Sequence, residues 1–444
     1  FGSRKNRLKR YVNIMIKRVY IKNYKSMREM EVWFQPLTVV FGPNAAGKSN
    51  LFDALNLVSR MVSEKSLKEA FSKHRGLPLE SVHLSPEQRD SDSSTLPKEN
   101  QRMVFEIDLS LSPKTISALE SRVRTLRKGI DSDSPDSKSK ILTNPHLRYR
   151  IELEVIAETG ETRVCDEKLV ALKQNRAEEK SRGAFLEKTE DTKGKQKLSL
   201  RLEGQSRPTL FDMGLNYAVV STELYAPHYP HIIALREELS RCHIYYFEPR
   251  TLMREAAAIA DVQRPGSYGE DLAAFYNTLE QHSPSQFKNL KNVAKSILPR
   301  LDNLSIERTN KGELYLLVHE DGTPFSNRLI SEGTLRVLGL VAVLSPFTGS
   351  TTVGYEEPEN GVHPRRLNQI AEILKNAHGD DRQILINTHS PILPGYFENQ
   401  NLMVCLREEG QTIFKPFTSI GSLYRPKEIE NHLDDRIERG DFGG

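Results

Sequence analysis

The hydrophobic pattern at the start of the chain predicts a strand, a glycine-rich turn and a helix. Residues 16–27 and 30–42 are rich in β-branched and aromatic side chains with polar residues between them, as in strands. The second segment runs directly into the sequence GPNAAGKSN, residues 42–50. Apolar residues then recur on one side of a predicted helix: Leu51, Phe52, Leu55, Val58 and Val62.

The middle of the chain alternates between polar stretches and short strand-like segments. The polar stretches, which predict loops or disorder, are residues 85–101, 128–140 and 173–183. The strand-like segments between them are residues 102–111, 146–160 and 197–204. This alternation predicts an antiparallel β-lobe with long excursions rather than a continued parallel sheet.

A helical region follows the β-lobe. Ser283 is suited to be an N-cap, Pro284 to be the first helical residue, and Gln286 to complete a capping box. The residues after them place one apolar face on the predicted helix: Phe287, Leu290, Ala294 and Ile297.

The last third of the chain holds three polar clusters, each joined to an apolar element. Ser331, Glu332 and Gly333 begin an apolar helix that continues to about residue 344. The short apolar strand from Thr351 leads into Glu356 and Glu357. A second apolar strand ends in Thr388, His389 and Ser390.

The glycine-rich turn has the spacing G-x-x-x-x-G-K-S of a phosphate-binding P-loop, in the strand–turn–helix setting that such a loop requires. Gly42 and Gly47 let the backbone curl so that amides point at a phosphate, and the helix N-terminus adds its positive dipole end. Lys48 is predicted to reach the β- and γ-phosphates, and the Ser49 hydroxyl to ligate Mg²⁺. The predicted ATP-binding residues are Gly42, Pro43, Asn44, Ala45, Ala46, Gly47, Lys48, Ser49 and Asn50.

The acidic sequence YEEPEN allows two interpretations. It is either a solvated turn or the end of a Walker B strand, in which one carboxylate supports Mg²⁺ and the next polarises water. A P-loop elsewhere in the chain supplies the phosphate and the metal, which favours the second interpretation. His389, which alone would be an ordinary structural histidine, then becomes a predicted γ-phosphate contact.

Bulk properties exclude little beyond these motifs. The 444 residues suffice for two or three domains, and the net charge of +4 permits nucleic acid as a partner without indicating it. Cys165, Cys242 and Cys405 are far apart, which predicts buried thiols in a reducing cytoplasm. No apolar run approaches the length of a membrane span. Residues 1–14 precede Met15 and are interpreted as a leader or tag; a basic DNA-binding arm is the alternative.

These motifs resemble the ABC-type ATPase heads of the SMC, RecF and OLD class, most closely the stand-alone AAA-type ATPases of bacterial defence loci. The resemblance covers residues 15–62 and 244–417 well and the middle only in general pattern. It implies an α/β fold: a P-loop ATPase head with a mixed central sheet, plus an inserted antiparallel β-lobe and a helical lobe. The implied division is a leader at 1–14, head segments at 15–110 and 301–417, inserted lobes at 111–300 and a tail at 418–444.

The resemblance also implies roles for single residues. Glu356 corresponds to the magnesium-supporting acid, Glu357 to the catalytic glutamate and His389 to the switch histidine. Ser331, Glu332 and Gly333 match the signature motif, which such proteins place against the γ-phosphate bound by the other subunit. Asn360, Gly361 and His363 occupy the loop that usually crosses the dimer interface. The chain departs from the pattern in having Glu356 where most relatives have Asp, and one signature glycine where transporters have two. No glutamine is assigned to the Q-loop.

The predicted function is therefore a Mg²⁺-dependent ATPase that works as a homodimeric or higher-order switch in the cytoplasm. It would act as the sensor of a bacterial anti-phage or DNA-maintenance system and control a separate effector such as a nuclease, with DNA as a further partner. A RecF-like repair ATPase and a nucleotide-bound scaffold with little hydrolysis are the alternatives. A transporter cassette is disfavoured by the large insertion, and a monomeric kinase or GTPase by the signature and NTHSP sequences.

No nuclease domain is expected in the chain itself. After His389 only 55 residues remain (444 − 389), of which part predicts one more strand pair. Asp434 and Asp435 are adjacent, but no apolar strand precedes them, which favours a solvated helix face over a metal site.

Overall fold

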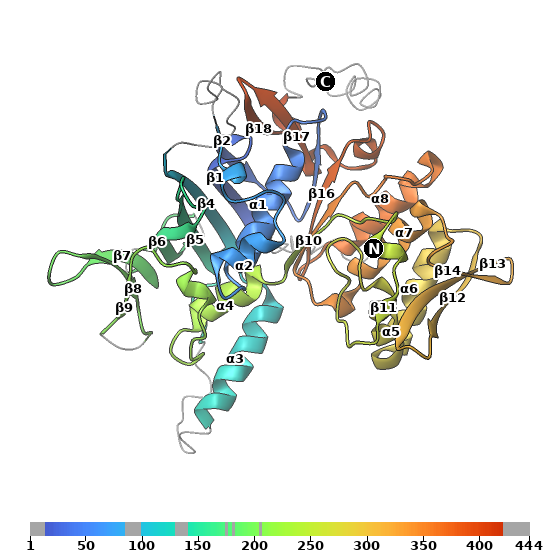
Figure 1. Ribbon diagram of the computed structural model, residues 1–444, viewed down its shortest axis with the longest axis horizontal. Coiled ribbons are helices and arrows are strands. Elements are labelled where there is room, and N and C mark those ends of the chain that lie inside the picture. The colour runs from blue at the N-terminus through green and yellow to red at the C-terminus, as the bar shows by residue number, and fades with distance from the viewer. Residues whose placement is uncertain are drawn as a thin grey trace, which may run out of the picture.

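The computed structural model describes residues 14–84, 99–128, 141–173, 176–179, 183–203 and 207–420, and these residues form three sheets. In Figure 1 the antiparallel sheet lies on the left, a six-stranded sheet in the middle and a mainly helical region on the right. Most of the polar stretches predicted as loops lie outside the described residues, as do the first thirteen residues and Asp434 and Asp435.

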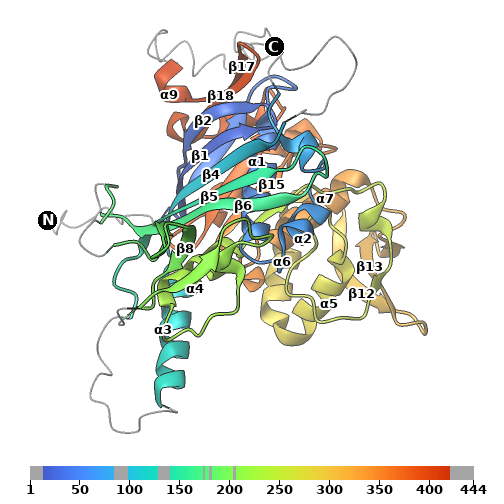
Figure 2. The ribbon, with the colours of Figure 1, turned by 60° about the vertical axis from the view of Figure 1, so that its left-hand side comes forward.

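The antiparallel sheet has eight strands and starts at the beginning of the described chain. Its strands in spatial order are β2 (Met27–Trp33), β1 (Ile16–Tyr24), β4 (Gln101–Ser110), β5 (His146–Val155), β6 (Thr162–Ala171), β7 (Leu186–Glu190), β8 (Gln196–Leu200) and β9 (Thr209–Asp212). Figure 2 shows β2, β1, β4, β5 and β6 side by side. The antiparallel lobe predicted from the middle of the chain is therefore present, and it also includes the first two strands.

The predicted strand over residues 30–42 is two strands in different sheets. β2 ends at Trp33, and β3 (Leu37–Phe41) begins just after Pro36. Proline has no backbone N–H and cannot donate to a ladder, so it interrupts the strand where the chain crosses between sheets.

The middle sheet carries the motifs predicted to bind nucleotide. Its strands in spatial order are β10 (Cys242–Tyr245), β15 (Thr352–Glu356), β16 (Gln383–Thr388), β3, β17 (Leu402–Glu408) and β18 (Gln411–Pro416). The first five are parallel, and β18 is antiparallel to β17. All residues of β3, β15 and β16 are buried, as expected for parallel strands covered on both faces.

Two hydrophobic cores lie on the two faces of the parallel sheet, and alternate residues of one strand enter different cores. In β3, Val40 packs in the core shared with the antiparallel sheet, whereas Val39 and Phe41 pack against the helices of the other face. In β16, Leu385 and Ile386 divide in the same way. Because successive side chains of a strand point to opposite faces, the parallel sheet contributes to both cores and connects them.

The helices divide between these two faces. The first core includes α1 (Lys48–Met61), α2 (Leu67–Ser72), α3 (Pro113–Lys128) and α4 (Pro230–Leu239). The second includes α5 (Leu272–His282), α6 (Pro284–Ile297), α7 (Glu332–Val343) and α8 (Leu367–Ala377) and the start of the short α9 (Phe417–Ile420). A small sheet of β11 (Ala257–Ala258), β13 (Glu313–Glu320), β12 (Leu301–Arg308) and β14 (Thr323–Ser326) packs beside them.

The helix predicted after Ser283 is present as α6, and its predicted apolar face is its buried face. The predicted capping box is wrong. Ser283 occupies the N-cap position without a side-chain hydrogen bond, and its own N–H bonds Leu279 at the end of α5. The side-chain oxygen of Gln286 is buried and has no hydrogen-bond partner in the described part of the chain. Because α5 runs almost directly into α6, the preceding helix takes the place of the cap.

The eight-stranded antiparallel sheet and the six-stranded middle sheet each contain strands from both sides of a predicted boundary, residue 110 or residue 300. β4, which belongs to the predicted head segment, pairs with β5 of the predicted insertion. β10, within that insertion, pairs with the Walker B strand β15. The boundaries stay a prediction, but the sheets cross both of them.

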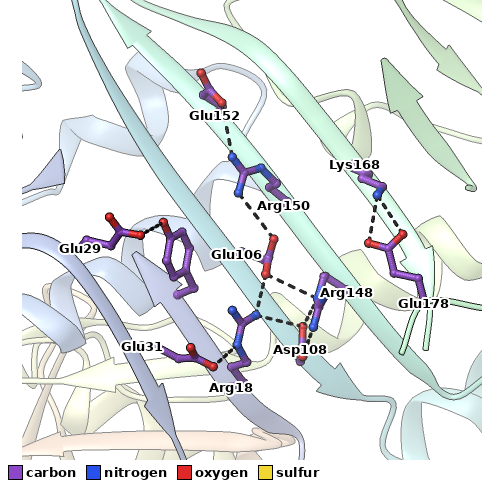
Figure 3. Close-up of polar contacts among 11 residues, drawn as sticks. Arg18, Glu29, Glu31, Glu106, Asp108, Arg148, Arg150, Glu152, Lys168 and Glu178 are labelled. Atoms are coloured by element: carbon purple, nitrogen blue, oxygen red, sulfur yellow. Dashed lines mark hydrogen bonds and ion pairs between the residues drawn. The ribbon is translucent and has the colours of Figure 1, made fainter. Parts of the chain in front are cut away.

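The outer face of the antiparallel sheet carries a row of paired charges (Figure 3). Arg148 lies opposite Asp108 in the β4–β5 register and contacts it at 2.6 Å, and Arg18 of β1 contacts Glu106 at 2.6 Å. Cross-strand pairs of this kind stabilise register by about 0.2–1 kcal/mol each. Since these arginines already have carboxylate partners, this row is not a free basic surface for nucleic acid.

Two further predictions concern the thiols and the membrane. Cys242 and Cys405 are buried as predicted, whereas Cys165 on β6 is only partly buried. None of the three is in a disulfide. Within the part of the chain that the structure describes, no helix has the length and apolar character needed to cross a membrane.

Candidate functional site

The P-loop follows β3 at the carboxyl edge of the parallel sheet, and its backbone requires glycine at two positions. Gly42 has φ +149° and Gly47 has φ +106°, values that disfavour other residues. A Cβ at Gly42 would lie 2.1 Å from the carbonyl oxygen of Cys405, and one at Gly47 2.1 Å from the hydroxyl of Thr412. The loop is therefore packed against the β17–β18 hairpin as well as being tightly curled.

This loop is held by side chains from distant parts of the chain that sequence reasoning missed: Ser26, Arg407 and Thr412. Thr412 Oγ1 donates to the Ala46 carbonyl at 2.6 Å and lies 2.6 Å from Ser26 Oγ. Asn50 donates to the same Ser26 hydroxyl at 2.7 Å. Arg407 donates to the Ala45 carbonyl at 3.3 Å. No local pattern distinguishes these residues, because their roles depend on which strands become neighbours.

Lys48 begins α1, and its ammonium group is held at the turn of the P-loop. Its Nζ donates to the carbonyl oxygens of Gly42 at 2.6 Å and Pro43 at 2.8 Å. Burial lowers the pKa of Lys48 to about 8, although the nearby Glu357 and Glu359 oppose the shift. A phosphate at the loop would add negative charge and favour the protonated lysine.

Ser49 and Glu356 meet although 307 residues separate them in sequence. Ser49 Oγ donates to Glu356 Oε2 at 2.7 Å, and Asn387 Nδ2 donates to the same oxygen at 3.2 Å. The contact follows from strand order: β15 and β16 are neighbours in a register that places Glu356 beside Asn387, and β16 lies beside β3. Burial raises the pKa of Glu356, and Arg75 and these hydrogen bonds oppose that rise.

Arg75, which no sequence motif singles out, contacts the second oxygen of Glu356. Its Nη2 lies 3.0 Å from Glu356 Oε1, and its Nε 3.6 Å from Asp53 on α1. The guanidinium also lies over the ring of Tyr246, 4.7 Å from the centroid. Lys25 holds the other oxygen of Asp53 at 2.7 Å. The acid predicted to support magnesium is therefore part of a charge network, not an isolated carboxylate.

Glu357 and His389 form a carboxylate–imidazole pair next to the contact between Ser49 and Glu356. His389 Nε2 lies 3.1 Å from Glu357 Oε1, and Asn360 donates to Glu357 Oε2 at 3.3 Å. These contacts, led by the hydrogen bond from His389, lower the pKa of Glu357. The backbone of Glu357 is left-handed, with φ +52°, so its side chain turns out of the strand direction. The structure thus brings together the predicted base and the predicted switch histidine.

Glu359, the third acid of YEEPEN, was not assigned from the sequence, yet it organises the end of β16. Its Oε1 accepts hydrogen bonds from the Thr388 hydroxyl at 2.6 Å and from the backbone N–H groups of His389 and Ser390 at 3.1 Å each. Its Oε2 is buried without a partner among the described residues. Burial raises the pKa of Glu359. One oxygen therefore fixes the backbone that carries His389.

A hollow of about 700 Å³ lies between these groups, a volume within the usual range of ligand sites. Its walls include Asn44 of the P-loop, Glu357, Glu359 and His389. Ser331 lines a different hollow of about 500 Å³, which contains no P-loop residue. Within one chain, the predicted catalytic Glu357 and switch His389 therefore share a hollow with the P-loop residue Asn44. Ser331 of the predicted signature does not line that hollow.

The predicted signature begins a capped helix. Ser331 Oγ accepts from the N–H of Thr334 at 3.1 Å at the start of α7, and Arg250 pairs with Glu332 at 2.9 Å. A Cβ at Gly333 would lie 2.2 Å from the carbonyl oxygen of Gly361. The absence of a side chain at Gly333 therefore allows the loop after Glu357 to approach α7.

The side chains suit a magnesium nucleotide. The Ser49 hydroxyl and the Glu356 carboxylate are hard oxygen ligands in direct contact, and Lys48 is a cation at a loop of backbone amides. No group of three or more metal-ligating side chains gathers within the described ranges. Mg²⁺ does not need one, since it is usually held by one or two side chains with phosphates and water.

Two family models match the chain, and they overlap. An AAA ATPase domain family matches residues 15–214. A second AAA domain family, described for a candidate AbiEii toxin of a type IV toxin–antitoxin system, matches residues 185–393. A comparison with curated protein sequences returned no match.

Solved structures give the fold. A crystal structure of the SMC head bound to the C-winged helix domain of ScpA aligns with a TM-score of 0.51 at 10% identity, over 90% of this chain and 98% of that one. The Smc head with an extended coiled coil, bound to the C-terminal domain of ScpA derived from Pyrococcus furiosus, aligns at 0.48 and 10% identity over 94% and 99%. The SMC head domain from Thermotoga maritima aligns at 0.39 and 11% over 91% and 99%.

The fold and the site define a P-loop protein with an SMC-like, ABC-type head, which confirms the predicted fold class. The chain is similar in sequence to two families of AAA ATPase domains, over residues 15–214 and 185–393, and it shares its fold with the SMC head.

Proposed function

We propose that this protein binds and hydrolyses Mg-ATP and uses the nucleotide to switch a homodimer between open and closed states. The observation that carries the proposal is the meeting of Ser49 with Glu356, 2.7 Å apart, at the edge where Glu357 and His389 pair at 3.1 Å. Two acids with different partners permit a division of labour between metal support and water activation. The similarity to two families of AAA ATPase domains supports nucleotide binding and hydrolysis.

Each residue has a role in this proposal. The P-loop amides and Lys48 bind the phosphates, and Ser49 and Glu356 hold Mg²⁺, which when bound neutralises phosphate charge. Glu357 Oε1 accepts a proton from the attacking water, because its lowered pKa keeps it ionised at neutral pH. His389 positions Glu357 and turns to the γ-phosphate as the site fills. Positioning and charge neutralisation carry most phosphoryl transfers, so few other groups are needed.

Dimerisation explains the separate position of the signature. Ser331 and Gly333 would bind the γ-phosphate held by the partner subunit, so that ATP contacts both chains and stabilises the closed pair. Hydrolysis removes this bridge, since a ligand shifts an equilibrium only through its differential affinity for the two states. The separate hollow at Ser331 supports this arrangement.

The switch would act on another molecule. A solved SMC head is bound to the C-winged helix domain of ScpA, and one family description refers to a toxin–antitoxin system. These likenesses support a head in the cytoplasm that holds a separate effector, such as a nuclease of a bacterial defence or DNA-maintenance system, with DNA as a further ligand.

Replacement of the base tests the proposal. Glu357→Gln keeps the shape of the side chain but loses the base, so it should retain ATP affinity, hydrolyse ATP at most at about one hundredth of the native rate, and accumulate as a dimer with Mg-ATP. Glu158→Gln, at an exposed position on the β5–β6 turn, is the matched control. Steady-state ATPase assays and sedimentation give both readouts. Native hydrolysis by Glu357→Gln would place the base elsewhere.

A scaffold with bound nucleotide and little hydrolysis is the second candidate, and one contact favours it. Arg75 occupies Glu356 Oε1 at 3.0 Å and competes with any metal for that carboxylate. If so, the native protein should bind ATP tightly with a turnover well below one per minute, and Arg75→Gln should raise the rate. A native turnover near the usual enzyme range of about 1 per second or more would exclude this candidate.

A further inference from the structure

A second hollow, of about 680 Å³, lies at the opposite edge of the parallel sheet from the P-loop. Its walls come from α6, α7 and α8, the start of α3 and the turns that precede β15 and β16. The lining is mostly apolar, and its apolar side chains include Leu290, Val293, Val341, Leu344, Ile373 and Ala377. Its volume falls in the range of small-molecule sites.

One end of this hollow is cationic. Lys114 on the first turn of α3 lines it, and no hydrogen bond or ion pair holds its ammonium group among the described residues. Burial and the nearby Arg241 and Arg382 lower the pKa of Lys114, while Asp381 at the rim opposes the shift. Arg241 donates to Thr115, and Arg382 donates to the carbonyl oxygens of Leu344 and Ser345, so both guanidiniums are fixed in place without a carboxylate.

Two residues in the wall of the hollow, Ser350 and His378, each have a buried polar atom without an ordinary hydrogen bond among the described residues. Ser350 is 3% exposed, and its hydroxyl has the phenol of Tyr245 nearby but no hydrogen bond of ordinary geometry. The Nδ1 of His378 is likewise buried and unpartnered among the described residues. Both residues line the hollow. Buried polar groups in native proteins are nearly always paired, which indicates that a ligand or ordered water completes them.

We propose that this hollow binds a small amphipathic organic anion: an apolar body against α6, α7 and α8, and a carboxylate or similar group near Lys114 and Ser350. The ammonium of Lys114 and the guanidinium of Arg382, which both line the hollow, supply the charge complementarity, and the apolar walls supply the affinity. A bound carboxylate would give Lys114 the ion-pair partner that it lacks among the described residues.

The position of the hollow makes it a regulatory site for the proposed ATPase, a role that rests on the proposed function. Val341 and Leu344 stand at the end of α7, whose other end carries the signature. Ser350 stands just before β15, which leads to Glu356, and Arg382 just before β16, which leads to His389. The 12-residue helix spans roughly 18 Å at 1.5 Å per residue, so one rigid element joins the two sites.

Decanoate and decanol are suitable probes, because they share an apolar body and differ in charge. Isothermal titration calorimetry on the full chain should show one decanoate site and weaker decanol binding. Lys114→Gln should weaken decanoate about tenfold, as for the loss of one charge-assisted contact, and leave decanol unchanged. Val293→Asp, at a position that is 36% exposed, should weaken both probes. Lys295→Gln, on the exposed face of α6, is the charge control.

Three results would overturn the site: no saturable decanoate binding, equal binding of the two probes by the native protein, or equal losses in Lys114→Gln and Lys295→Gln. The regulatory role is tested separately, by ATPase assays with saturating decanoate. We expect a change of at least twofold in native protein that is absent in Lys114→Gln. An unchanged rate refutes the regulatory role alone, and the binding data stand whether or not the protein hydrolyses ATP.

Discussion

Replacement of Glu359 should disconnect the Walker B loop from the switch strand. One carboxylate oxygen accepts three hydrogen bonds, from the Thr388 hydroxyl and from the N–H groups of His389 and Ser390. Each bond is worth about 0.5–1.5 kcal/mol net, and hydrogen bonds to charged groups more, so Glu359→Ala should cost about 2–4 kcal/mol of folding free energy. Water entering the vacated space would reduce the loss towards the lower figure.

Glu359→Gln provides the matched comparison. Its amide oxygen can take the place of Oε1, and its amide group then occupies the position of Oε2, which has no partner among the described residues. We therefore expect Gln to retain most of the stability and the ATPase rate, whereas Ala lowers kcat more than it raises KM, because His389 is no longer held. Urea unfolding and steady-state kinetics give both numbers. Equal damage by Ala and Gln, or no effect of Ala, would refute the reasoning.

The pH dependence gives this prediction a sign. Burial raises the folded-state pKa of Glu359 above its ordinary value of 4.5. The ionised carboxylate is thus less favourable in the folded chain than in the unfolded chain, which costs stability at neutral pH. This cost decreases as the pH falls through the raised pKa and is absent below the ordinary value. Glu359→Gln, which cannot ionise, should compare best with the native protein at neutral pH and lose that relative advantage in acid.

Three other substitutions test the site. Lys48→Ala should weaken ATP binding by at least about tenfold. The ATP affinity of the native protein should be full below pH 8 and fall above it, because Lys48 has a pKa of about 8 without nucleotide and must be protonated to bind phosphate. Calorimetry in buffers of different ionisation enthalpy measures the proton uptake on ATP binding. Glu356→Gln should lose Mg²⁺ dependence and affinity, which a magnesium titration of ATP binding would detect. Gly333→Ala should bind ATP but fail to hydrolyse it, since the new Cβ would lie 2.2 Å from the Gly361 carbonyl oxygen and force it to move. Normal turnover would show that the loop at Gly361 is free to move.

Those parts of the fold that depend on local sequence could be predicted. The P-loop between β3 and α1, the apolar face of α6 and the capped start of α7 all follow from spacing over a few residues. The pairing of Ser49 with Glu356 was inferred from a resemblance, not from spacing. Strand order brings them together, and strand order depends on packing across the whole sheet.

Other parts of the site could not be predicted, because they depend on contacts between distant segments. Arg75 lies in an unremarkable polar turn, and only the position of α2 against the sheet takes it to Glu356. Thr412 supports the P-loop from a hairpin 366 residues away from Ala46. Glu359 did carry a signal, because it is a third acid two residues after the predicted Walker B pair, and an acid that is buried there needs partners. Its meaning was missed because its partners are mainly backbone groups, which have no sequence signature.

The contacts of Arg75 indicate how the site would change when a metal nucleotide binds. In the described chain Glu356 has two sets of partners: Ser49 and Asn387 on one oxygen, and Arg75 on the other. Arg75 is also shared with Asp53 and the ring of Tyr246, so it has other favourable contacts if it leaves Glu356. A metal ion at Ser49 would supply the positive charge that Arg75 now gives to the carboxylate, and the two cations would repel each other. Metal binding and release of Arg75 are therefore coupled by charge, which links the state of the nucleotide site to the segment after α2.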